Sequence, residues 1–182
     1  MVRQVLGRAV QATLFDFERG RFALSHWKNL SIVVYATGAD GAMLARISKL
    51  TPLMRKEFPG GHSNLAFVLN GCPLPTEEAQ QAIVAAYRNP ESGLCCASVI
   101  VEGEGFWASA LRSSVIGMGL QAERIRLSLH SKMSEMIEWL PVEHEKSTGV
   151  VLNKTQLLRV ATEARRKSLE VLDEIADRGE GA

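Results

Sequence analysis

Apolar residues in this chain fall into short continuous runs and helix-spaced stripes that alternate along most of its length. The clearest unit starts at residues 97–101, a continuous apolar run that ends in a turn containing Gly103 and Gly105. From Phe106 onward, apolar residues recur every three or four positions, which is the helical period. Residues 124–130 then alternate apolar and polar, as a half-exposed edge strand does. We therefore predict strand, tight turn, helix and parallel strand, joined by a right-handed connection.

Further strands are predicted upstream of this unit. Residues 14–18 and 21–24 flank Arg19 and Gly20, which favours a hairpin with a glycine turn. Runs at 29–36 and 64–69 have the length and apolar character of buried strands. The pattern as a whole predicts an α/β fold with a mixed, largely parallel sheet of four to five strands, packed helices and a long C-terminal helix.

Two helical regions lie between these strands. One carries helix-spaced apolar residues from Met43 onward, with Asp40 as its expected N-cap and a kink or restart expected at Pro52. The other spans residues 76–88, where Thr76 is the expected cap and two glutamates face the positive end of the helix dipole. Its apolar stripe predicts packing against the sheet.

The C-terminal third predicts two more helices. Ser131 is the expected cap of a short helix that Pro141 ends, and the polar residues 142–149 predict a linker. An amphipathic helix extends from Asn153 to about Asp177. The predicted division of the chain is an α/β domain over 1–141, a linker over 142–152 and a C-terminal helix over 153–182.

Two apolar features outside the predicted core are candidate contact surfaces. An isolated amphipathic helix is marginal in water, so the C-terminal helix must pack on its own sheet, on a second copy or on another protein. The aromatic pair at the start of the central helix either packs against a neighbouring helix, which is the simpler expectation, or lines a pocket or interface. The candidate interaction or pocket residues are Phe106, Trp107, Leu157, Ala161, Ala164, Leu172 and Ile175.

Composition narrows the range of partners. The 182 residues carry a net charge of +1 and are 46% hydrophobic and 23% charged, as in ordinary globular proteins. No overall field attracts nucleic acid, no apolar run is long enough to span a membrane, and no export signal is recognisable. The three cysteines form no C-x-x-C motif. We expect a cytoplasmic protein that binds another protein or itself.

Motifs for catalysis, metals and cofactors are sparse. The four histidines lack metal-ligand spacing, and neither a nucleophile elbow nor a P-loop is found, so no metal and no catalytic residues are predicted. Residues 103–108 match the dinucleotide pattern G-x-G-x-x-A, but Glu102 and Glu104 would repel a pyrophosphate. A plain turn without cofactor is therefore expected. An enzyme that uses Glu102 or Glu104 with His130 as an acid–base pair stays open as an alternative.

The predicted order of elements resembles the SpoIIAA-like, STAS-related domains. Residues 127–140, a strand followed by a Ser cap and an amphipathic helix ending in Trp139 and Leu140, look like the close of many small uncharacterised bacterial members. Residues 101–107 are also similar to those proteins, as are Arg112 and Ser113. The resemblance covers roughly residues 13–140 and implies a four- or five-stranded mixed sheet with a regulatory or scaffolding role without catalysis.

The chain departs from this family at the phosphorylation site of its anti-sigma-factor antagonists. Those proteins carry a Ser in an Asp-Ser context just after a central strand, whereas the corresponding loop here is 71–76 and has only Thr76. The helix-cap role explains Thr76 without modification.

Two non-catalytic functions follow from these observations. The first is a regulatory or scaffolding module that acts through protein–protein interaction. The second is a small-molecule or lipid-binding protein that uses the carboxyl ends of the strands, where ligands gather in open α/β sheets. Those ends hold Thr37 and Gly38, residues 70–72, residues 102–105, and His130 and Ser131.

Overall fold

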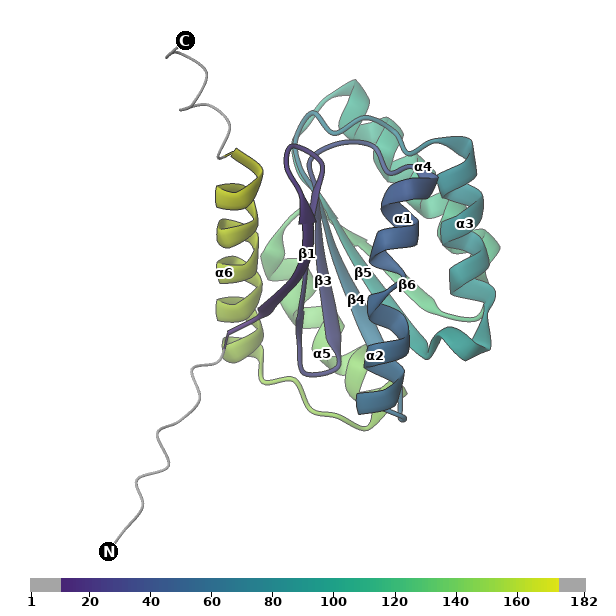
Figure 1. The fold of residues 1–182 in the computed structure, drawn as a ribbon, viewed down its shortest axis with the longest axis vertical. Coiled ribbons are helices and arrows are strands. Elements are labelled where there is room, and N and C mark those ends of the chain that lie inside the picture. Colours follow the sequence, from purple (N-terminus) through teal and green to yellow (C-terminus); the bar gives the residue numbers. More distant parts are fainter. Residues whose placement is uncertain (1–10, 174–182) are drawn as a thin grey trace, which may run out of the picture.

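The computed structural model describes residues 11–173, and the strands of this part of the chain form one mixed sheet (Figure 1). The sheet order follows the chain order, antiparallel from β1 to β3 and parallel from β3 to β6. The strands are β1 (Thr13–Glu18), β2 (Phe22–Trp27), β3 (Leu30–Tyr35), β4 (His62–Val68), β5 (Leu94–Val101) and β6 (Arg126–His130). The predicted mixed, largely parallel α/β sheet is confirmed, but the described sheet has six strands rather than four or five, because both hairpin strands join it.

Helices cover both faces of the sheet (Figure 1). They are α1 (Gly41–Ile47), α2 (Leu50–Glu57), α3 (Glu77–Arg88), α4 (Phe106–Ala122), α5 (Met133–Thr148) and α6 (Lys154–Asp173). The first four lie on one face, and α5 and α6 lie on the other. Alternate residues of the central strands enter the two cores: Val33 contributes to the first, and Ile32 and Val34 contribute to the second. Burial on both faces explains why these strands are continuous apolar runs.

The predicted helix starts at Asp40 and Thr76 are confirmed. The Asp40 carboxylate accepts a hydrogen bond from the backbone N of Met43 at 2.9 Å, and the Thr76 hydroxyl accepts one from Ala79 at 3.2 Å. The predicted break near Pro52 falls slightly earlier, since α1 ends at Ile47 and α2 starts at Leu50. Proline then lies in the first turn of α2, where its missing N–H has no helical acceptor to lose.

The predicted linker is wrong for residues 142–148, which continue α5, and Pro141 lies inside this helix. Two polar residues of this segment, Glu143 and His144, are buried, and both have hydrogen-bond partners. The Glu143 carboxylate accepts from Arg126 at 3.0 Å and from Lys146 at 2.9 Å. Gly149, with φ +72°, ends the helix instead of the proline.

The start of α5 also differs from the prediction, which placed Ser131 as its cap. The N-cap is Lys132. The side chain of Glu135 accepts hydrogen bonds from the backbone N of Ser131 at 2.9 Å and of Lys132 at 3.3 Å. A carboxylate in the first turn thus accepts from the backbone donors that precede the helix, as the N3 glutamate of a capping box does.

The C-terminal helix α6 packs on its own sheet, which is the first of the three alternatives that the sequence left open. Its four described candidate residues are buried in the core that it shares with β3, β4, β5 and α5, and so form no exposed surface: Leu157, Ala161, Ala164 and Leu172. The fifth, Ile175, lies outside the described residues. The helix and the predicted α/β domain therefore share one core.

The glycine turn after β5 is closed by the chain's own side chains. Gly103 has φ +87°, and a Cβ there would lie 2.1 Å from Oδ1 of Asn70. The Arg112 guanidinium donates to the carbonyl oxygens of Val101 at 3.1 Å and Gly103 at 2.8 Å. Nε of Arg165 in α6 lies 2.6 Å from the carboxylate of Glu102. Glycine is thus required here by backbone conformation and by the close approach of Asn70.

We predict that Gly103→Ala lowers the free energy of unfolding by roughly 1–3 kcal/mol, because alanine must adopt a positive φ and displace Asn70. Gly117→Ala is the matched control: Gly117 lies inside α4 with open space around its Cβ position, so this variant should gain about 0.5–1 kcal/mol. Urea unfolding measures both values. A Gly103→Ala protein as stable as the wild type would contradict this explanation of the turn.

Candidate functional site

A cleft of about 490 Å³ lies between α1–α2 on one side and α3 on the other, with the sheet as its floor. The floor is apolar: Ala66 of β4 pairs with Val99 of β5 and with Val33 of β3, and Leu24 lines the cleft from β2, on the far side of β3. Two alanines of α3, Ala82 and Ala86, contribute only short side chains to the wall opposite α1. Larger side chains at these lining positions would fill part of the cleft.

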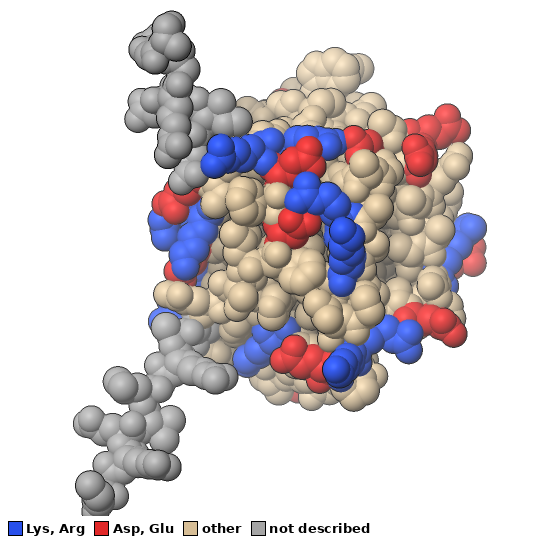
Figure 2. Space-filling view, viewed as in Figure 1, with Lys and Arg blue, Asp and Glu red and all other residues tan. Residues whose placement is uncertain are grey.

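The apolar stripe of α3 forms this wall and is only partly covered. Ile83 and Tyr87 are half-buried, and Ala82 and Ala86 are exposed to the cleft. With Ala79 these four residues form the apolar stripe of the helix predicted over 76–88, and of the five only Ala79 is buried. In Figure 2 the surface between these helices carries mainly uncharged residues.

Neutral polar groups are distributed along this apolar lining. They belong to Ser31, Tyr35, Thr37, His62, Asn64, Tyr87 and Ser92, among others. Of the described residues that line the cleft, Glu78 alone is charged, and it is exposed to solvent beside Gly41. The lining is therefore suited to a molecule that is mostly apolar and hydrogen-bonds at a few points.

His62 is the most deeply buried of these polar side chains, at 5% exposure. Its Nδ1 has no hydrogen-bond partner among the described residues. Burial lowers the pKa of His62 to about 4, so the ring is neutral at pH 7. The neighbouring Asn64 is held in place, because its Nδ2 donates to Oγ of Ser31 at 3.0 Å and that hydroxyl donates to the carbonyl of Ser63 at 3.2 Å.

Two tyrosines supply further hydroxyls. Burial raises the pKa of Tyr87 to about 12. The pKa of Tyr35 is also raised, mainly by burial and further by the nearby side chains of Tyr87 and Cys72. Both side chains therefore stay protonated at neutral pH. Neither hydroxyl makes a hydrogen bond to any described residue, so both are available to a bound molecule.

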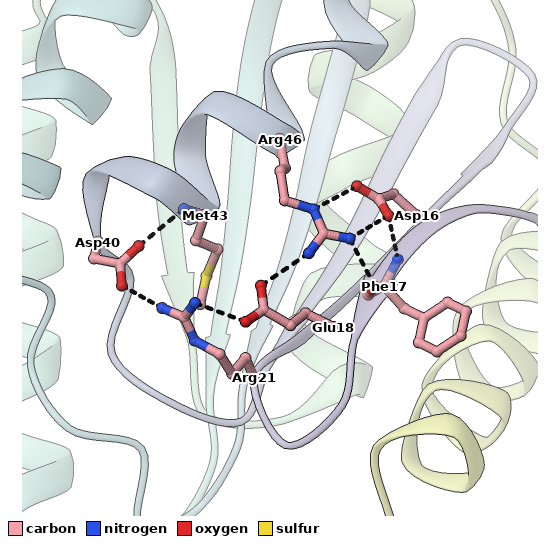
Figure 3. Close-up of polar contacts among 7 residues, drawn as sticks. All are labelled: Asp16, Phe17, Glu18, Arg21, Asp40, Met43 and Arg46. Atoms are coloured by element: carbon pink, nitrogen blue, oxygen red, sulfur yellow. Dashed lines mark hydrogen bonds and ion pairs between the residues drawn. The ribbon is translucent and has the colours of Figure 1, made fainter.

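Ion pairs hold α1, one wall of the cleft, against the β1–β2 hairpin (Figure 3). Arg46 of α1 donates from Nε to Asp16 at 3.0 Å and from Nη1 to Glu18 at 2.9 Å. Arg21 then bridges Glu18 and Asp40, the cap of α1. The hydrogen bond from Arg46 is the main reason why the pKa of Asp16 is lowered. These charges lie outside the cleft lining and fix the wall without entering it.

A second polar cluster is buried on the opposite face of the sheet. His144 of α5 contacts Oδ1 of Asn29 through Nε2 at 2.9 Å and Oγ of Ser63 through Nδ1 at 2.7 Å. The same Oγ lies 3.0 Å from Sγ of Cys96. All four residues are buried and none lines the cleft. Although the residue types match a nucleophile–histidine set, burial raises the pKa of Cys96 to about 11, and the cluster serves to attach α5 to the sheet.

The residues singled out in the sequence are not brought together in one site. Phe106 and Trp107 are 77% and 63% exposed, and their rings meet edge-to-face with centroids 5.6 Å apart. The prediction that they pack on a neighbouring helix is therefore wrong. They begin α4 directly after its N-cap, Gly105.

The carboxyl ends of the strands contribute only in part to the cleft. Thr37 and Cys72 line it, whereas residues 102–105 and His130 do not. Glu102 is engaged by Arg165, and His130 packs near the ring of Trp139 at 5.9 Å. No hydrogen bond joins Glu102 to His130 in the described chain, so the acid–base pair gains no support.

Sequence reasoning missed the amino-terminal part of the cleft, namely His62, Asn64, Tyr87 and Ser92. The predicted strand began at residue 64, whereas β4 starts at His62. A usable signal was present: His62, Asn64, Ala66 and Val68 are spaced by two and share one face of β4.

Comparison with protein-family models, with curated proteins and with solved structures finds no match. The described residues contain no group of three or more His, Cys, Asp or Glu side chains that could hold a metal ion. None of the helices described between residues 11 and 173 has the length and apolarity needed to cross a membrane. The resemblance to SpoIIAA-like domains stays a prediction.

We predict that acid destabilises this protein well above the titration range of its carboxylates. Burial lowers the pKa of both His62 and His144 to about 4, so the unfolded chain, with His near 6.5, binds protons first as the pH falls. The stability that these neutral rings contribute is complete above pH 6.5 and is lost progressively toward pH 4. Urea unfolding between pH 7 and 5 should show it.

His144→Gln tests the assignment, since glutamine keeps hydrogen-bonding groups and does not titrate. This variant should lower the slope of the free energy of unfolding against pH by up to one proton, which is about 1.4 kcal/mol per pH unit. An unchanged slope would show that His144 is not among the groups responsible.

Proposed function

We propose that this chain is a non-catalytic binding protein whose cleft holds a small, largely apolar molecule. The cleft itself is the observation that carries the proposal: about 490 Å³ over a floor of Leu24, Ala66 and Val99, with neutral hydrogen-bonding groups around it. Volumes of this size are typical of sites for small ligands. An apolar occupant would gain roughly 25 cal/mol for each Å² of apolar surface removed from water.

The protonation states in the cleft favour binding over chemistry. A general base works best with a pKa near the operating pH, but His62 has a pKa of about 4. The Tyr87 hydroxyl, with a pKa of about 12, is far from ionising. The Cys72 thiol, whose pKa burial raises to about 11, is a poor nucleophile. These groups suit recognition by neutral hydrogen bonds.

A regulatory role in the cytoplasm, of the kind that the SpoIIAA-like resemblance implies, is compatible with this binding function. The cleft is walled by α1, a short helix held by ion pairs that are partly exposed. Occupancy of the cleft would then be the quantity that is sensed. This extension keeps the protein non-catalytic.

The proposal predicts that Ala86→Trp blocks binding, because an indole at this position of α3 projects into the cleft from an exposed site. Ala85→Trp is the matched control, since Ala85 is the exposed neighbour on the same helix and does not line the cleft. Native mass spectrometry of the freshly purified proteins should find a bound small molecule in the wild type and in the control, but not in Ala86→Trp.

Thermal unfolding in the presence of a panel of small apolar molecules covers the case in which the ligand is lost on purification. Stabilisation of the wild type and of Ala85→Trp, but not of Ala86→Trp, supports the proposal. If no molecule co-purifies and none raises the unfolding temperature, the cleft is not a ligand site.

A second candidate function, self-association, is favoured by the outer face of α4. Phe106, Ile116 and Leu120 are exposed on this helix, and its sole ion-forming side chain, Arg112, is turned to the backbone of the glycine turn. The helix lies beside β6, an edge strand of the described sheet. An uncharged face next to a strand edge fits a second copy of itself in a twofold arrangement.

Ile116→Lys should therefore lower the weight-average mass in analytical ultracentrifugation at micromolar concentrations, because a buried lysine opposes the contact. Leu53→Lys on α2 is the matched control, with Leu53 at 52% exposure against 51% for Ile116. A wild-type protein that stays monomeric at all concentrations would exclude self-association through α4.

A further inference from the structure

We infer that the cleft selects an uncharged ligand with a hydrogen-bonding head group, and that this head group binds at the end of the cleft formed by His62, Asn64 and Ser92. This inference rests on the proposed function. It adds the chemical class of the ligand and the end of the cleft at which its head group binds. In chemical terms the ligand is a long-chain alcohol, ketone or amide, or a compound of similar polarity, and not a free fatty acid.

The lining of the cleft is almost without charge, which is the first observation behind the inference. No Lys or Arg belongs to the described lining, and its one charged residue, Glu78, is negative. An anionic head group that enters such a site loses its hydration without gaining a counter-ion. The acid would then bind in its protonated form only, at a cost that grows with pH.

The buried ring of His62 is the second observation. The residue lines the cleft, and neither ring nitrogen has a hydrogen-bond partner among the described residues. Nδ1 is enclosed beside Gly93, and an unsatisfied buried polar atom costs roughly 1–3 kcal/mol. A neutral hydroxyl or amide in the cleft can pair with the ring through its other nitrogen in either tautomer.

Asn64 and Ser92 extend this polar end. Asn64 stands two residues further along β4, on the same face as His62, and Ser92 comes from the turn that leads into β5. Beyond them the floor becomes apolar at Ala66 and Val68. The ligand's apolar part therefore runs from Asn64 toward the carboxyl ends of the strands.

Two arginines lie beside the polar end, and neither lines the cleft. Nη2 of Arg124 lies 3.4 Å from Oγ of Ser92, but this guanidinium already donates to the carbonyls of Tyr87 at 3.1 Å and Leu94 at 2.8 Å. The exposed side chain of Arg55 on α2 approaches Gly93, where its Cγ would be 3.0 Å from an added Cβ. Arg55 is the residue that would pair with a carboxylate if the inference were wrong, and it is therefore included in the test.

The test uses two fluorescent probes that share one aromatic skeleton and differ in charge: neutral phenylnaphthylamine and the anionic anilinonaphthalene sulfonate. At pH 7.4 the wild-type protein should bind the neutral probe at least tenfold more tightly, and Ala86→Trp should bind neither. Octanol should displace the neutral probe at a concentration at least tenfold below that of octanoate.

The His62→Leu variant tests whether the head group of the ligand binds at the His62 end of the cleft. The lost hydrogen bond should weaken octanol about fivefold and leave chlorooctane unchanged, since only the alcohol hydrogen-bonds to the His62 ring. The far-ultraviolet circular dichroism spectrum shows whether this variant folds, and the wild-type probe comparison decides the class of ligand if it does not.

The remaining outcomes separate the inference from the proposed function. Equal binding of both probes to the wild type, or octanoate as strong as octanol, overturns the neutral-ligand inference and leaves ligand binding intact. Loss of octanoate binding in Arg55→Ala would then identify the cation responsible. Absence of binding by either probe overturns both proposals.

Discussion

The parallel strands β3, β4 and β5 must be covered on both faces, and the two faces are covered in different ways. On one face α5 and α6 pack closely and bury Leu140, Leu157 and Val160 completely. On the other face α1, α2 and α3 meet the sheet without closing over it, and the cleft remains. The proposed ligand site depends on that difference, because apolar surface left open costs free energy unless something fills it.

The closely packed face makes the open one possible. The hydrogen bonds of His144 to Asn29 and Ser63 tie α5 to strands whose other face is partly uncovered. The ion pairs of Arg46 and Arg21 hold α1 on the hairpin from outside the cleft. The wall formed by α1 is thereby fixed by ion pairs outside the cleft, and the lining of the cleft stays almost uncharged. A stable frame and a neutral interior are the two conditions that a site for an apolar molecule needs.

Local patterns along the chain were enough to predict the hairpin, the β3 and β4 runs, the caps at Asp40 and Thr76, and the edge strand β6. They failed where distant partners decide the outcome. Residues 142–148 are polar and predicted a linker, yet Glu143 is buried between Arg126 and Lys146. Phe106 and Trp107 are apolar and predicted packing, yet no element of the described chain covers them. The general expectation that ligands gather at the carboxyl ends was met by Thr37 and Cys72 alone.

The sequence by itself determined the class of the fold, because the change from a period of two to a period of 3.6 residues marks strands and helices and requires no knowledge of their partners. It also determined that the glycine turn after β5 serves backbone geometry. Only the tertiary structure decided where space remains. A cleft depends on the separation of helices and on which small side chains border it. Ala66 and Ala86, twenty residues apart, look like ordinary core alanines until the fold places one on the floor and the other on a wall of the same cleft.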